Sequence, residues 1–122
     1  MQNLINWIEI PATNIHRAIN FYSAILDPEI QEAEFFGSKM GFFPSDGTNV
    51  SGAIVLGEDY IPVKNGVLAY LNGGSNLQVV LDKIEINHGM VLVPKTQISP
   101  EMGYFAMFLD TEGNKMALHS TN

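Results

Sequence analysis

Two amphipathic stripes at a fixed separation constrain this sequence more than any other feature. After Asn14, apolar residues recur every three or four positions, as on the buried face of a helix. The same spacing recurs after Asn76, and each apolar position there follows its counterpart by 62 residues: Ile15 and Leu77, Ala18 and Val80, Ile19 and Leu81, Tyr22 and Ile84. A stripe repeated at one offset predicts that the chain contains the same structural unit twice.

A strand precedes each stripe and three more follow it. Alternation over residues 4–10 places Trp7 and Glu9 on one face of the first strand. Gly89 is expected to be the left-handed residue that ends the second helix. The remaining strands are predicted at 31–36, 39–44, 50–56, 67–71, 90–94, 103–109 and 114–120. The predicted fold is α+β, with two βαβββ modules forming a cupped mixed sheet.

The 122 residues are predicted to form one domain, 1–122, with module one at about 3–58 and module two at about 66–120. A module of this size has one helix, which covers only one face of its sheet. The other face must meet the second module or a second copy of the chain. A concave surface between the modules is therefore expected.

The charge balance and the absence of cysteine exclude several classes of function. A net charge of −7, from 13 acidic and 6 basic residues, repels phosphate backbones and anionic lipid, so we expect neither nucleic-acid nor membrane partners. With no cysteine, disulfides, thiolate nucleophiles and cysteine-ligated metals are excluded. No signal-peptide pattern or apolar run of about 20 residues occurs, which predicts a cytoplasmic protein.

Three stretches of the sequence resemble one known superfamily. They are WIEIPATNIHRAINFYSAIL at 7–26, GVLAYLN at 66–72 and GYFAMFLDTEGNKMALH at 103–119. Together they resemble the vicinal oxygen chelate superfamily, which includes glyoxalase I, bleomycin-resistance proteins and extradiol dioxygenases. The resemblance implies the glyoxalase/bleomycin-resistance fold and a homodimer. It specifies function poorly, because one fold hosts many chemistries.

The resemblance also implies four metal-ligand positions, in the first and last strands of each module. These positions correspond to Trp7, Val67, Ala117 and the strand 50–56, which contains no His, Asp or Glu. Indole, isopropyl and methyl groups cannot coordinate a divalent cation. We therefore expect no metal cofactor, and a metal-dependent lyase or dioxygenase remains an alternative that would need other ligands.

Two polar residues are predicted on the same inner faces. Glu9 follows Trp7 by two residues, and His119 follows Ala117 by two, so each shares a face with its neighbour. If their strands line one cleft, Glu9 and His119 could act as catalytic general base and acid on a carbonyl compound without a metal. They could equally hydrogen-bond a ligand without transforming it.

The predicted function is metal-independent binding of a small molecule, or a weak lyase or isomerase activity, in an apolar cleft with Trp7 as a flat wall. One alternative is sequestration of a drug or metabolite without catalysis, as in bleomycin-resistance proteins, and an acidic protein suits a cationic ligand. Phe105 and Met107 share the face of Ala117 if Leu109 pairs with Lys115. The predicted binding residues are Trp7, Val67, Phe105, Met107 and Ala117.

Overall fold

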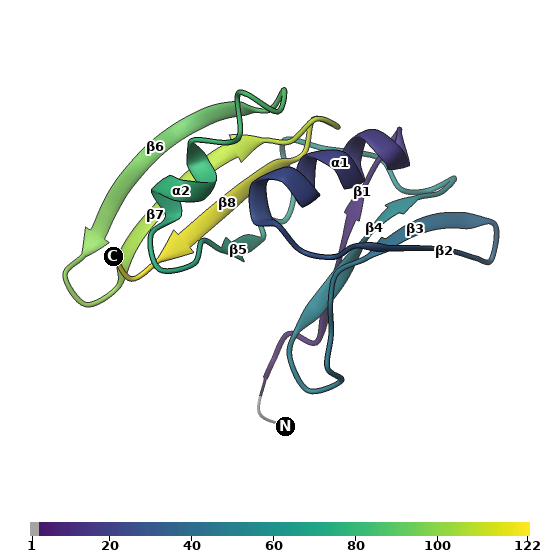
Figure 1. The fold of residues 1–122 in the computed structure, drawn as a ribbon, viewed down its shortest axis with the longest axis horizontal. Helices are drawn as coiled ribbons and strands as arrows, with labels where there is room; N and C mark the ends of the chain where they lie inside the picture. The colour runs from purple at the N-terminus through teal and green to yellow at the C-terminus, as the bar shows by residue number, and fades with distance from the viewer. Residues whose placement is uncertain (1–2) are drawn as a thin grey trace.

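The computed structural model describes residues 3–122 and contains two modules with the same order of elements (Figure 1). The first contains β1 (Trp7–Pro11), α1 (Ile15–Leu26), β2 (Gln31–Phe35), β3 (Ser38–Phe42) and β4 (Ser51–Leu56). The second contains β5 (Tyr70–Asn72), α2 (Leu77–Leu81), β6 (Met90–Ser99), β7 (Gly103–Leu109) and β8 (Lys115–Ser120). The predicted α+β fold of two βαβββ modules is confirmed.

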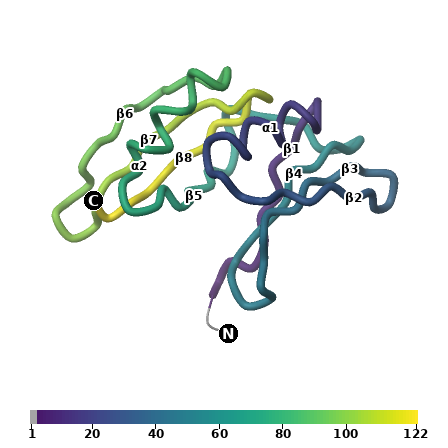
Figure 2. The backbone as a smooth tube through the Cα atoms, in the orientation of Figure 1, coloured from purple at the N-terminus to yellow at the C-terminus, as the bar shows by residue number. Residues whose placement is uncertain are grey.

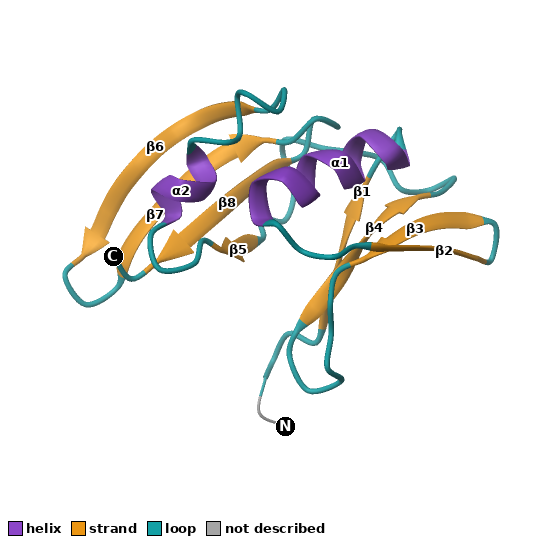
Figure 3. Cartoon of the chain, in the orientation of Figure 1, coloured by secondary structure: helices purple, strands orange, loops and turns teal. Residues whose placement is uncertain are grey.

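Each module forms its own four-stranded mixed sheet. The strand orders are β1-β4-β3-β2 and β5-β8-β7-β6, with the first and last strands of each module parallel and all other pairs antiparallel. The chain completes the first module before it enters the second (Figure 2). Each sheet packs one face against a helix, and no helix covers its other face, which is called the inner face (Figure 3).

Both helices and both sheets meet in one core. Phe21 of α1 packs edge-on against Tyr22, with 5.1 Å between ring centroids, and lies 6.1 Å from the ring of Phe108 on β7. The same cluster contains Ile10 of β1 and Leu118 of β8. Because both modules supply its walls, neither module could bury its apolar stripe alone.

The second helix differs from its prediction at its end. α2 stops at Leu81, although Ile84 remains fully buried in the turns that follow. The left-handed residue is His88, with φ of 76°, so the prediction for Gly89 is wrong. Gly89 is needed for close approach instead, because a Cβ there would lie 2.8 Å from the Phe21 ring and from the Leu109 carbonyl oxygen.

Three predicted strand limits also need correction. β1 begins at Trp7 rather than at residue 4, and β5 begins at Tyr70 rather than at Val67. β6 runs to Ser99, five residues beyond its prediction, because it continues to pair with β7 through three register shifts. Among the described residues, no helix is long and apolar enough to cross a membrane.

The β2–β3 hairpin holds a backbone conformation that its sequence disfavours. Its two turn residues, Phe36 and Gly37, have φ of 52° and 80°, and the Phe36 side chain is fully exposed. Such turns favour Asn-Gly, because a bulky residue is strained at positive φ.

The substitution Phe36→Asn is expected to raise the free energy of unfolding by about 0.5 to 1 kcal/mol, because asparagine tolerates positive φ. Urea unfolding measures the difference. Phe35→Asn is the matched control: it removes a ring 6.0 Å from that of Phe42 and should destabilise the protein. A loss of stability in Phe36→Asn would contradict the strain argument.

Candidate functional site

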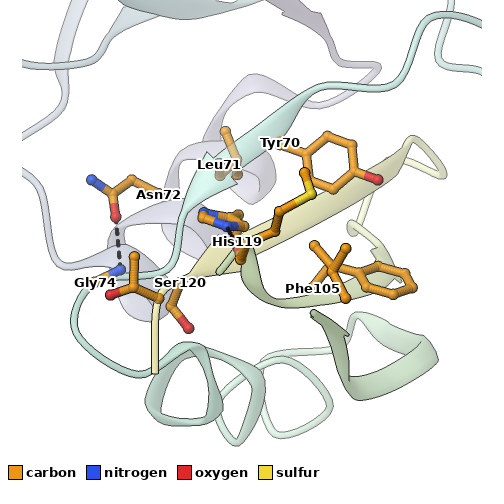
Figure 4. Close-up of a pocket in the computed structure, with 10 residues that line it drawn as sticks. Tyr70, Leu71, Asn72, Gly74, Phe105, His119 and Ser120 are labelled. Carbon is orange, nitrogen blue, oxygen red and sulfur yellow. Dashed lines mark hydrogen bonds between the residues drawn. The ribbon is translucent and has the colours of Figure 1, made fainter. Parts of the chain in front are cut away.

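An open hollow of about 940 Å³ lies on the inner face of the second sheet. All four strands of the second sheet and the β6–β7 turn contribute residues to its walls (Figure 4). The residues that define it are Tyr70 and Asn72 of β5, Ile98 of β6, Met102 of the turn, Phe105 of β7 and His119 of β8. The lining is mainly apolar, and its polar side chains include the His119 imidazole, the Tyr70 phenol and the Asn72 amide.

The strand register brings these side chains to one face. His119 pairs with Phe105 on one side and with Asn72 on the other, and Ala117 pairs with Met107 and with Tyr70. Side chains of paired residues point to the same face of a sheet. The predicted pairing of Leu109 with Lys115 is confirmed, so Phe105 and Met107 share the face of Ala117 and His119.

His119 is oriented by a backbone contact. Its Nε2 lies 2.6 Å from the carbonyl oxygen of Met102. A carbonyl oxygen only accepts, so Nε2 carries the hydrogen of this bond. The contact ties β8 to the β6–β7 turn and leaves Nδ1 as the ring nitrogen available to a ligand.

Trp7 and Glu9 lie on the inner face of the other sheet. The Trp7 indole Nε1 donates to Glu9 Oε2 at 3.4 Å, and the Tyr60 hydroxyl donates to Glu9 Oε1 at 2.6 Å. The hydrogen bond to Glu9 and its negative charge raise the pKa of Tyr60. β1 and β8 belong to different sheets, and the residues that line the hollow include His119 but neither Trp7 nor Glu9.

The hollow contains residues that the sequence prediction missed, chiefly Tyr70. The turn after β5 is one residue longer than the turn after β1. The backbone N–H of Ala12 donates to β4 and that of Gly73 donates to β8 in the equivalent place, and these two residues are 61 positions apart. The helix caps Asn14 and Asn76 are 62 positions apart, so the second turn contains one extra residue. Gly74, at φ of 77°, lies in the longer turn. A one-residue shift turns every strand side chain to the other face. Tyr70 therefore takes the inner-face place of Glu9, while Val67 lies before β5, almost fully exposed, and does not line the hollow.

The motif at 110–114 is a buried polar network between the modules. Asp110 accepts from the Tyr22 hydroxyl at 2.6 Å and from Asn114 Nδ2 at 3.0 Å. Asn114 Nδ2 also donates to the Pro11 carbonyl at 2.7 Å. Burial and the charge of Asp110 raise the pKa of Tyr22 well above its usual value, so its hydroxyl remains a donor. The motif joins the β7–β8 turn to α1 and β1.

Glu112 in the same turn caps the first helix from the second module. Its carboxylate accepts from the backbone N–H groups of Thr13 at 2.9 Å and Asn14 at 2.8 Å, and it pairs with Arg17 Nε at 2.7 Å. Burial alone would raise the pKa of Glu112, but the hydrogen bonds from Arg17 and these backbone groups outweigh it and lower the pKa to about 2. This carboxylate therefore has a structural role.

No family model matches the sequence, but a relative does. A "Glyoxylase-like domain-containing protein" of Didymella fabae is 32% identical over 124 residues, which cover 93% of this chain and 91% of that protein. The chain belongs to the vicinal oxygen chelate superfamily. The resemblance stated from the sequence is confirmed.

Solved structures in this superfamily share the fold. The glyoxylase/bleomycin resistance protein/dioxygenase domain from Frankia sp. EAN1pec matches with a TM-score of 0.76 at 10% identity, over 100% of both chains. TnmS3, an antibiotic binding protein from Streptomyces sp. CB03234, matches with a TM-score of 0.67 at 18% identity, over 100% of this chain and 99% of that chain. At these identities the likeness shows the fold alone.

The superfamily implies a divalent metal, and the side chains here do not fit one. Within residues 3–122 no three His, Asp or Glu side chains gather closely enough to hold an ion. Ala53 stands beside Glu9 in the first sheet, and Ala117 stands beside Tyr70 in the second. Methyl groups offer no lone pair to a cation. We therefore derive no step through a metal.

Proposed function

We propose that the protein binds a small organic ligand in the hollow of the second sheet, without a metal ion. The observation that supports this is a hollow with an apolar wall, formed by Ile98, Met102 and Phe105, and a few convergent polar groups, among them His119. Ligand sites in proteins typically have this composition. TnmS3, which shares the fold, is an antibiotic binding protein, and this supports binding as a function of such a hollow.

Sequestration is favoured over catalysis by the positions of the two predicted catalytic residues. Glu9 and His119 belong to different sheets, and Glu9 already accepts hydrogen bonds from Trp7 and Tyr60. A general acid and base must both reach one substrate. Within one chain, His119 lines the hollow and Glu9 does not, so a ligand there would contact only one of the two groups.

A homodimer forms part of this proposal. Large apolar side chains are exposed on both inner faces, with Trp7 at 42%, Tyr70 at 53% and Met102 at 61%. A two-fold pair in which the first sheet of one copy covers the hollow of the other would bury these side chains. Light scattering after gel filtration tests this, and a monomer at micromolar concentration would contradict it.

Removing the imidazole is expected to weaken ligand binding about tenfold, the effect of one lost hydrogen bond of about 1.4 kcal/mol. A thermal-shift screen of metabolites and antibiotics identifies ligands, and calorimetry then compares the wild type with His119→Ala and Tyr70→Ala. His16→Ala is the matched control, because His16 is exposed on α1 and pairs with Glu32, away from the hollow. Unchanged dissociation constants in both site variants would refute the proposed site.

Two further measurements separate the alternatives. A ligand that is consumed, and consumed only while Glu9 is intact, would show a metal-independent lyase or isomerase. Stoichiometric nickel, zinc or iron after dialysis would instead show a metal-dependent lyase or dioxygenase with ligands other than those expected. A ligand bound but recovered unchanged from metal-free protein is the outcome that the proposal expects.

A further inference from the structure

The carboxylate of Glu9 is held by neutral aromatic groups rather than by a cation. Trp7 donates to one of its oxygens and Tyr60 to the other. In the part of the chain that the structure describes, the ion pairs are His16–Glu32 and Arg17–Glu112, and neither includes Glu9. Its negative charge is therefore hydrogen-bonded but not neutralised.

The surroundings of this carboxylate are aromatic on more than one side. Tyr60 comes from the connector between the modules, and its hydrogen bond to Glu9 keeps the phenol protonated by raising its pKa. The Phe42 ring on β3 lies 6.1 Å from that of Trp7, tilted by 50°. Phe42 and Glu9 both pair with Ala53, so they share the inner face of the first sheet. Aromatic faces carry partial negative charge and attract cations.

We propose that Trp7, Glu9, Phe42 and Tyr60 bind the cationic group of an organic ammonium ligand. The inference goes beyond the proposed function, because these residues belong to the first sheet and its connector and do not line the hollow of the second sheet. A carboxylate beside aromatic rings suits an alkylated ammonium, which is weakly hydrated and has an apolar surface. A hard metal ion would require several oxygen ligands, and Glu9 supplies a single carboxylate. The net charge of −7 also favours the approach of a cation.

Trp7 makes this site directly observable, because it is the only tryptophan of the chain. Choline is the probe, and 3,3-dimethylbutan-1-ol, which has nearly the same shape without the charge, is its control. Choline should change the Trp7 fluorescence saturably, and the neutral alcohol should bind at least about tenfold more weakly. Equal responses to both compounds would overturn the proposal.

Two charge-removing variants test the role of Glu9. Glu9→Gln should abolish the preference for choline over the neutral alcohol. Glu34→Gln also removes one carboxylate from the first sheet, but Glu34 lies on β2 and on the face of the sheet opposite to Glu9 and Phe42. This variant should preserve the preference for choline. Tyr60→Phe keeps the ring and loses the hydroxyl, so it should retain binding while altering the Trp7 emission. If Glu34→Gln lowers choline binding as much as Glu9→Gln does, the attraction comes from net charge and not from this cluster.

The outcome for this inference is separable from that for the proposed function. Suppose that choline fails to bind, but that a neutral or anionic compound from the thermal-shift screen binds and His119→Ala weakens its binding. This result would refute the ammonium site and support the ligand site in the hollow. If choline binds, but His119→Ala changes the binding of no screened compound, the result would support the cation site at Glu9 and refute the ligand site in the hollow.

Discussion

Replacing Asp110 with alanine is expected to lower the free energy of unfolding by roughly 3 to 5 kcal/mol. Asp110 is only 4% exposed and accepts four hydrogen bonds. Two come from Tyr22 and Asn114 side chains, and two come from the backbone N–H groups of Glu112 and Asn114, at 2.9 Å each. Alanine leaves these buried donors without a partner. Each unsatisfied donor costs about 1 to 3 kcal/mol of stability, and water that enters the site offsets part of this loss.

A double-mutant cycle isolates the contact between the modules. Tyr22→Phe should lower the free energy of unfolding by about 1 to 2 kcal/mol, and adding it to Asp110→Ala should cost less than the sum of the two. Asp46→Ala is the matched control, because Asp46 accepts three hydrogen bonds from Thr48 and Asn49 in an exposed turn and should matter far less. Strict additivity in the cycle would show that Tyr22 and Asp110 are not coupled.

The sequence was sufficient to predict the modules. Each helical stripe buries the residues that its spacing marks, from Ile15 and Ala18 in α1 to Leu77 and Val80 in α2. Both helices are capped by an asparagine, with Asn14 and Asn76 accepting backbone N–H groups. These features are local, since a helix face and its cap depend on residues within a few positions.

The faces of β5 were harder to predict, because strand register depends on turn length. An offset taken from the helices does not hold in the strands, where the turn containing Gly74 adds one residue. The extra residue brings Tyr70 to the inner face, a position the prediction did not assign to it. Counting the residues between strand and cap in each module is the sequence signal that could have found Tyr70.

The separation of Glu9 from His119 could not be predicted from either strand alone. It depends on how two sheets are placed relative to each other, and contacts between residues about 100 positions apart contribute to that placement. Thr13 and Glu112 are an example: the N–H of one meets the carboxylate of the other at 2.9 Å. Neither residue stands out in the sequence pattern of its own module.

Glu112→Gln tests this long-range contact and should remove roughly 3 kcal/mol of stability at neutral pH. The carboxylate side chain is 0% exposed, and its pKa falls from 4.5 in the unfolded chain to about 2 in the folded protein. A lowering of that size corresponds to roughly 3 kcal/mol, at about 1.4 kcal/mol for each pKa unit. Glutamine keeps the shape but loses the charge that Arg17 and the helix N-terminus stabilise.

The dependence on pH distinguishes this charge from simple packing. Because the folded pKa is the lower one, the contribution of Glu112 is fully present above pH 4.5 and is lost as the pH falls toward 2. The difference in unfolding free energy between the wild type and Glu112→Gln should therefore be largest at pH 7 and shrink between pH 4.5 and 3. Glu101→Gln, at an exposed glutamate of the β6–β7 turn, is the control and should show no such dependence. A difference that stays constant across this range would mean that Glu112 joins the modules by its shape and not by its charge.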